Sequence, residues 1–291
     1  MKKLVSSVLV LCMIAVALAG CGNKSTETTK ATEATASTES AVSTEAVSET
    51  QAAEDEAATV QVYIAASLSN AMDEISVNYK SVQPNVDLVF NAGSSGKLQT
   101  QIEEGGACDV FFSAATKQMN ALVEGGYVQE ADVTDLLENK VQLIKSAGTE
   151  TKVTGFENIT DAANLALAAD TVPVGQYARE IFDNLGITDQ VMAMEINECE
   201  DVSAVLAAVS EGSNEVGIVY ATDAASVADK VDVIATASDT ELKSKVIYPV
   251  GLVKNTEADD AEVAAAKAFV DYLKTPEAAA VFEKYGFSCI N

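Results

Sequence analysis

The sequence contains no histidine, no tryptophan and a single arginine, Arg179. Without histidine, the chain can form neither a Ser-His-Asp nor a Cys-His catalytic arrangement, and it can hold no histidine-ligated zinc or iron. With 18 basic against 44 acidic residues, its formal net charge at pH 7 is −26. Nucleic acids and anionic lipid headgroups are bound through clustered lysine and arginine, so this charge argues against both as partners.

Cysteine is also scarce, and its spacing offers no metal cluster. Of the five cysteines, Cys12 lies in the N-terminal signal described below and Cys21 directly follows it, which leaves three in the remainder of the chain. No CxxC spacing occurs, so we expect no metal site and no cofactor. Three is an odd number, so one disulfide at most can form within the chain, and its pairing stays open. The three residues are Cys108, Cys199 and Cys289.

The first 20 residues have the pattern of a secretory signal. Lys2 and Lys3 precede an apolar run over residues 4–19 that is short for a membrane span. The segment ends in Leu-Ala-Gly-Cys at Cys21, which resembles the lipobox of bacterial lipoproteins. This predicts a signal peptide over residues 1–20, cleavage before Cys21 and lipid modification of that cysteine. The protein would then be anchored to the cell membrane on its extracellular or periplasmic side.

Residues 21–58 predict a disordered tether. From residue 22 to residue 58, 29 of 37 residues are Ser, Thr, Ala or Glu, and none is aromatic. Such a segment cannot bury enough apolar surface to offset the entropy lost on ordering.

From residue 59 the sequence predicts an α/β fold of two lobes. Strand and helix patterns alternate up to residue 124, and a second such series begins beyond residue 150, which indicates two mainly parallel sheets flanked by helices. Two β-rich stretches, 141–145 and 246–253, would carry the chain out of the first lobe and back. We expect lobe 1 over residues 59–144 and 250–291, lobe 2 over residues 145–249, and a ligand cleft between them.

Four predicted helices begin with small hydroxyl residues or bare backbone. The entries lie at Ser67, at Ser94-Ser95, around Val174 and at Asp201-Val202. Helix N-termini present unpaired N–H groups and the positive end of the helix dipole, so several that converge could hold an anion without a cationic side chain. Taken singly, Ser67 and Asp201 are typical N-caps and Ser94 and Ser95 are typical of turns. Tyr220, which ends an apolar strand, is by itself typical of a core residue.

The segment Gly93-Ser94-Ser95-Gly96-Lys97 is not a phosphate-binding loop. A Walker A motif has four residues between its glycines and Ser or Thr after the lysine, whereas here two residues intervene and Leu98 follows. We expect Lys97 to point outward from its helix.

Over residues 59–291 the sequence is similar to the periplasmic molybdate-binding proteins of ABC importers, the ModA family. The similarity rests on AASLSNAM at 65–72, GSSGKLQTQI at 93–102, ACDVFFSA at 107–114 and VPVGQYARE at 172–180, followed by EDV at 200–202, GIVYATDA at 217–224, YPV at 248–250 and YGF at 285–287.

The resemblance implies the type II periplasmic-binding-protein fold, with molybdate or tungstate held between the lobes. By position, the implied ligand contacts are Ser67, Ser95, the backbone at Val174 and Val202, and the hydroxyl of Tyr220. Gly96 stands where some members have a third serine, and between Ser94 and Ser95 we take Ser95 as the second hydroxyl ligand. The implied partner is an ABC permease that reads closure of the lobes, and the protein would act as a monomer.

A donor-only site suits molybdate, a dianion near pH 7 whose oxygens only accept hydrogen bonds. Hydrogen phosphate would require an acceptor for its proton. Sulfate remains the nearest alternative ligand. Two other classes stay open at this point: a secreted hydrolase with Ser95 or Ser67 as nucleophile and Lys97 as base, and a structural surface lipoprotein in which the polar helix entries are only caps.

Overall fold

The computed structural model describes residues 57–290. The expected signal peptide, the lipid-modified Cys21 and almost all of the expected tether lie outside the described residues. Within residues 57–290, no helix combines the length and the apolar character that crossing a bilayer requires.

The first lobe is built on a six-stranded sheet, here called sheet A, with the strand order β11-β4-β10-β3-β1-β2. Its central strands are apolar on both faces, and Val60, Val62 and Phe112 are completely buried. The strands are β1 (Ala58–Ala65), β2 (Val86–Gly93), β3 (Val110–Phe112), β4 (Val128–Asn139), β10 (Val246–Val253) and β11 (Ser288–Cys289).

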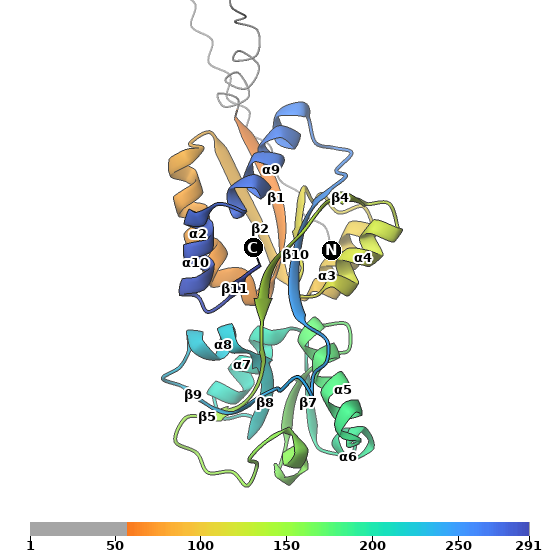
Figure 1. Cartoon of the computed structure of the whole chain (residues 1–291), viewed down its shortest axis with the longest axis vertical. Helices are drawn as coiled ribbons and strands as arrows, with labels where there is room; N and C mark the ends of the chain where they lie inside the picture. The colour runs from red at the N-terminus through yellow and green to blue at the C-terminus, as the bar shows by residue number, and fades with distance from the viewer. Residues whose placement is uncertain (1–56, 291) are drawn as a thin grey trace, which may run out of the picture. The chain divides into compact units, whose positions relative to one another are not determined.

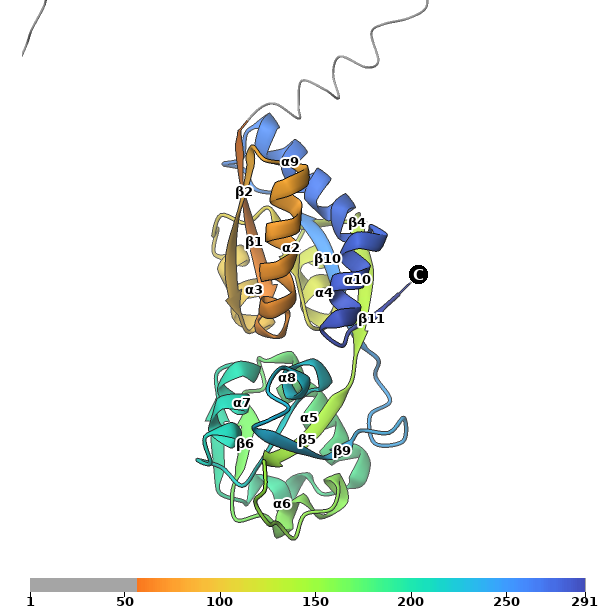
Figure 2. The ribbon, with the colours of Figure 1, turned by 90° about the vertical axis from the view of Figure 1, so that its left-hand side faces the viewer.

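Helices cover both faces of sheet A (Figure 2). One face carries α2 (Ser69–Val82), α9 (Asp260–Leu273) and α10 (Pro276–Lys284), and the other carries α3 (Ser95–Glu103) and α4 (Thr116–Glu124). Because side chains alternate along a strand, Phe112 packs in the core on the first face and Phe111 packs in the core under α3 and α4.

The second lobe is built on a five-stranded sheet, sheet B, with the order β7-β6-β8-β5-β9. Its strands are β5 (Val141–Ser146), β6 (Leu165–Ala168), β7 (Ile196–Cys199), β8 (Val216–Tyr220) and β9 (Val231–Thr236). The helices of this lobe are α5 (Pro173–Leu185), α6 (Thr188–Met192), α7 (Val202–Ser210) and α8 (Ala221–Ser226). Within residues 57–290 the short 3-10 helices are η1 (Ala66–Leu68) and η2 (Phe156–Asp161).

The α/β class and the two flanked sheets are as expected, but each sheet is mixed rather than mainly parallel. In sheet A, β1 is parallel to β2 and β3, while β10 is antiparallel to β3 and β4. In sheet B, β6 is parallel to β7 and β8, while β5 is antiparallel to β8 and β9. The antiparallel pairs involve β4, β5 and β10, which flank the connections between the lobes. These strands are not joined by the strand–helix–strand units that make neighbouring strands parallel.

The chain passes from sheet A to sheet B at Lys140 and returns over residues 237–245 (Figure 1). The expected boundaries, 144/145 and 249/250, fall inside β5 and β10. The β-rich stretches 141–145 and 246–253, which the sequence predicts to carry the crossing, are strands of the sheets that the chain enters.

This topology brings the carboxyl ends of six parallel strands together. In sheet A these are the ends of β1, β2 and β3, and in sheet B they are the ends of β6, β7 and β8. Each residue predicted to contact the ligand either follows the end of one of these strands or, as Tyr220 does, forms the last residue of a strand. The carboxyl edge of a parallel sheet is the usual place for a ligand.

Candidate functional site

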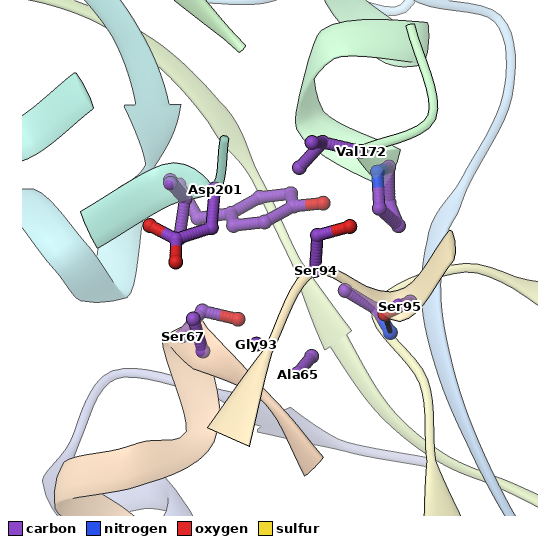
Figure 3. Close-up of a pocket in the computed structure, with 12 residues that line it drawn as sticks. Ala65, Ser67, Gly93, Ser94, Ser95, Val172 and Asp201 are labelled. Atoms are coloured by element: carbon purple, nitrogen blue, oxygen red, sulfur yellow. Dashed lines mark hydrogen bonds between the residues drawn. The ribbon is translucent and has the colours of Figure 1, made fainter. Parts of the chain in front are cut away.

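A small cavity lies where the strand ends of the two lobes meet (Figure 3). Its volume is small, about 10 Å³, which limits the cavity to a small ligand. Cavities that hold sugars, peptides or nucleotides are many times larger. The lining residues are Ala65, Ala66, Ser67, Gly93, Ser94, Ser95, Ala114, Val172, Pro173, Asp201, Val202 and Tyr220.

Ser67 lies in η1 and does not act as a helix cap. Neither η1 nor α2 has a side-chain cap, so the N-cap role that is typical of a serine at this position is wrong here. Its hydroxyl instead lies 2.9 Å from the hydroxyl of Tyr248, which is 181 positions away in the sequence. The Ser67 side chain is therefore held by a tertiary contact at the cavity wall.

Ser94 and Ser95 both line the cavity but have different partners. Ser94 is the N-cap of α3, and its hydroxyl accepts the Lys97 amide at 3.2 Å. The Ser95 hydroxyl, which is completely buried, accepts the Ala114 amide at 3.0 Å. Because its oxygen already accepts a protein donor, the Ser95 proton remains available to a ligand.

Two helix N-termini of the second lobe reach the same region. Val202 is the first residue of α7 and lines the cavity. Val174 does not line it; Val172 and Pro173 of the same helix entry do. Proline has no N–H, so the amide of Val174 is the first that α5 can offer, and helix-start amides have no acceptor within their own helix.

Tyr220 ends β8 and lines the cavity, and its hydroxyl is buried without a hydrogen-bond partner among the described residues. The side chain is 2% exposed. Burial raises the pKa of Tyr220 well above its ordinary value, so the hydroxyl keeps its proton. Because Tyr220 lines the cavity, a ligand there can accept this proton.

No lining residue is Lys or Arg, and Asp201 is the acidic member of the set. Its carboxylate caps α7 by accepting the Ala204 amide at 2.9 Å, as expected. In Figure 3 it points toward α7 and away from Ser94 and Ser95. Behind Tyr220, Asp223 accepts the Tyr220 amide at 3.1 Å, and burial raises the pKa of Asp223 to about 7.

Lys97 lies outside the cavity wall and forms an ion pair with Glu200 of the second lobe at 2.6 Å. The hydrogen bond from Lys97 lowers the pKa of Glu200. The lysine is therefore engaged with a carboxylate and does not serve as a base for Ser67 or Ser95, which leaves the hydrolase alternative without a general base.

The described residues show neither a disulfide nor a metal cluster. Cys108, Cys199 and Cys289 are all free thiols. Over residues 57–290, no group of three or more Cys, Asp or Glu residues could hold a metal ion.

Around the cavity the lobes contact each other directly. A β-carbon placed on Gly96, at the start of α3, would lie 2.1 Å from the carbonyl oxygen of Thr171 in the second lobe. Gln118 of α4 donates to Gln176 of α5 at 3.3 Å. The cavity is thus enclosed by groups of both lobes.

Asn139 and Tyr248 stand behind Ser67, and sequence patterns did not single them out as site residues. Asn139 donates to Tyr248 at 3.2 Å and to Thr222 of the second lobe at 2.9 Å. Their partners are between 83 and 181 residues away. Of these two residues, only Tyr248 belongs to a segment that carries the family resemblance, YPV at 248–250.

Comparison with known proteins identifies related chains over most of the described length. The family described as bacterial extracellular solute-binding proteins matches residues 60–288. YvgL of Bacillus subtilis, described as an ABC transporter substrate-binding lipoprotein, is 36% identical over 235 residues, which is 80% of this chain and 88% of YvgL. The molybdate-binding protein ModA of Escherichia coli is 36% identical over 237 residues, 79% of this chain and 88% of ModA.

A solved structure of similar sequence shares the fold. The substrate-binding domain of a molybdenum ABC transporter from Clostridium difficile superposes with a TM-score of 0.61 at 34% identity, over 81% of this chain and 100% of that domain.

Proposed function

We propose a function from one premise: the chain belongs to the family of bacterial extracellular solute-binding proteins, and its relatives above 30% identity include molybdate-binding ModA. The proposed function is capture of molybdate, and also of tungstate, outside the cytoplasm and delivery of the anion to an ABC import permease. The family consists of solute-binding proteins, so the protein is not an enzyme.

The observation that carries this proposal is a cavity lined by hydrogen-bond donors that lack an acceptor. The Tyr220 hydroxyl has no partner among the described residues, and the Ser95 oxygen is already occupied by the Ala114 amide. The start of α7 at Val202 lines the cavity and adds an amide donor, and the amide of Val174 follows Pro173 of the cavity wall. A fully deprotonated tetrahedral oxyanion satisfies such donors, whereas hydrogen phosphate brings a proton that needs an acceptor.

Sulfate is the competing ligand, since it is also a dianion without protons near pH 7. Its bonds are shorter than those of molybdate, so donors spaced for molybdate would bind sulfate at stretched distances, where hydrogen bonds weaken. Tungstate is nearly the same size as molybdate and should bind equally well.

The proposed transport step is closure of the two lobes around the anion. Ser67 and Ser95 belong to the first lobe, while Val174, Val202 and Tyr220 belong to the second. An anion that bridges both sets stabilises the closed arrangement selectively, and only such differential contact shifts a conformational equilibrium. The permease would then recognise the closed, loaded protein.

The proposed location is the outer side of the cell membrane, through lipid on Cys21 and a tether over residues 21–58. The lipobox resemblance supports this, and so does the description of the relative YvgL as a lipoprotein. We propose that the protein works as a monomer, held near its permease.

Isothermal titration of the purified protein with molybdate, tungstate, sulfate and phosphate tests the proposal. We expect one-to-one binding of molybdate and tungstate, with sulfate at least about a hundredfold weaker, a gap of roughly 2.7 kcal/mol. Equal affinity for sulfate would refute the assignment of the ligand. Absence of saturable heat with all four salts would refute the function.

A further inference from the structure

Behind Ser67, a chain of hydrogen bonds leads away from the cavity to the point where the chain crosses between lobes. Tyr248 of β10 is completely buried, and its hydroxyl lies between the Ser67 hydroxyl, at 2.9 Å, and the side-chain amide of Asn139, at 3.2 Å. Asn139 is the last residue of β4, immediately before Lys140. Neither Asn139 nor Tyr248 lines the cavity.

The direction of these hydrogen bonds follows from one backbone amide. The Lys140 N–H donates to the side-chain oxygen of Asn139 at 2.8 Å. A backbone N–H can only donate, so the Asn139 atom beside it is the oxygen, and the Asn139 nitrogen is the atom that faces Tyr248. Asn139 therefore donates and the Tyr248 oxygen accepts.

The Tyr248 proton must then go to Ser67. Ser67 is the other partner within hydrogen-bond distance of the Tyr248 hydroxyl, at 2.9 Å, while the neighbouring Tyr220 hydroxyl lies outside hydrogen-bond geometry. The opposite direction, from Ser67 to Tyr248, would leave a completely buried phenol proton without an acceptor, which is costly. Burial also raises the pKa of Tyr248 well above its ordinary value, so the proton is retained.

We propose that Asn139 and Tyr248 are positioning residues that fix the Ser67 hydroxyl as a donor toward the bound anion. The Ser67 oxygen accepts from Tyr248, so its own proton is directed elsewhere, and the cavity is where it can be used. This inference rests on the proposed function, and it assigns to two residues outside the cavity a part in selecting fully deprotonated oxyanions. If the Ser67 hydroxyl could rotate freely, its oxygen lone pairs could face the cavity. They would then repel a fully deprotonated dianion but could accept the proton of a protonated oxyanion.

The same amide also connects the two lobes. The Asn139 nitrogen donates to the Thr222 hydroxyl of α8 at 2.9 Å, in addition to Tyr248. One side chain therefore contacts both Tyr248 of the first lobe and Thr222 of the second, beside the point where the chain crosses between them.

A double-mutant cycle of Tyr248→Phe and Ser67→Ala tests the proposal by titration with molybdate. Phenylalanine keeps the edge contacts of the ring with Tyr220 and Phe287, whose centroids lie at 5.7 and 5.3 Å. We expect Tyr248→Phe to weaken binding by about tenfold, as for a lost donor. In the Ser67→Ala background the same change should weaken binding by less than about twofold, because its effect passes through Ser67.

The matched control is Tyr79→Phe, which removes another buried phenol oxygen of the first lobe. Tyr79 is 1% exposed, and its hydroxyl has no partner among the described residues and lies outside the cavity wall. Its affinity for molybdate should equal that of the parent.

The outcomes separate the two proposals. Suppose the parent binds molybdate and the losses of binding free energy from Tyr248→Phe and Ser67→Ala are additive in the double variant. This result would overturn the positioning role but not the proposed function. Parent-like affinity of Tyr248→Phe would do the same. A parent that binds no molybdate would overturn the function and, with it, the positioning role.

Discussion

Ser94 and Ser95 show how neighbouring residues with identical side chains take different tasks. Ser94 satisfies an amide of its own helix, as N-caps do. Ser95 accepts an amide from the segment after β3 and keeps its proton for the cavity. The distinction depends on Ala114, 19 residues away, and no local sequence pattern contains it.

We predict that Ser95→Ala weakens molybdate binding by about 1.5 to 3 kcal/mol, because a donor to a charged ligand is lost. Ser94→Ala should instead lower the free energy of unfolding by about 1 kcal/mol, with a change in affinity below about threefold. Titration calorimetry and thermal unfolding of both variants measure the two effects. A larger loss of affinity in Ser94→Ala than in Ser95→Ala would show that Ser94, and not Ser95, is the hydroxyl that binds the anion.

At the scale of elements, the close approach of α3 to the second lobe depends on glycine. A β-carbon at Gly96 would meet the Thr171 carbonyl oxygen at 2.1 Å and its carbonyl carbon at 3.0 Å. Backbone atoms cannot turn aside as a flexible side chain can. A side chain at position 96 must therefore move α3 away from the segment before α5.

We predict that Gly96→Ala weakens molybdate binding by at least about tenfold, because the donors of the two lobes can no longer meet at one anion. Small-angle X-ray scattering with saturating molybdate should give a larger radius of gyration than the parent. Gly148→Ala is the control: Gly148 has φ +72° and open space around it, so alanine there strains the backbone but leaves the lobes free to close. Parent-like affinity of Gly96→Ala would show that the lobes do not need this close approach.

Most helices and parallel strands could be predicted from the sequence, since their apolar residues recur with the expected periods. The helix entry predicted at Ser94-Ser95 is the start of α3, and the apolar strand predicted to end at Tyr220 is β8. The strands β4 and β9 were not predicted, because consecutive exposed residues, at 129–131 in β4 and at 232–233 in β9, break the alternation of buried and exposed positions. The mixed sheets also escaped prediction, because pairing direction follows from how the chain crosses between lobes.

Helix starts and strand ends in the sequence led to five proposed contacts, of which Val174 does not line the cavity. Ser67, Ser95, Val202 and Tyr220 line one cavity. The support for Ser67 was not predictable, because Asn139 and Tyr248 reach it only through tertiary contacts.

For the whole molecule, charge opposes the proposed ligand. A net charge of −26 repels a dianion at long range, and no lysine or arginine lines the cavity to counter it. Attraction would come only from short-range donors. Salt screens the long-range repulsion, with a Debye length of about 10 Å at 0.1 M.

We predict that the association rate of molybdate rises by a few-fold between about 10 and 150 mM NaCl. Stopped-flow fluorescence can follow binding through the tyrosines, since the chain has no tryptophan and Tyr220 lines the cavity. Sodium sulfate at equal ionic strength shows whether the anion of the salt competes. A rate that falls as NaCl rises would indicate an attractive field and a cationic side chain at the site.

The position of β10 in sheet A determines when the first lobe can be completed during biosynthesis. β10 lies between β3 and β4 and pairs with both, yet it follows the whole second lobe in the chain. A nascent polypeptide that stops before residue 246 would leave the facing edges of β3 and β4 unpaired, and unpaired edges invite aggregation. The first lobe therefore cannot be completed until the second lobe has been synthesised, although its first strands leave the ribosome earliest.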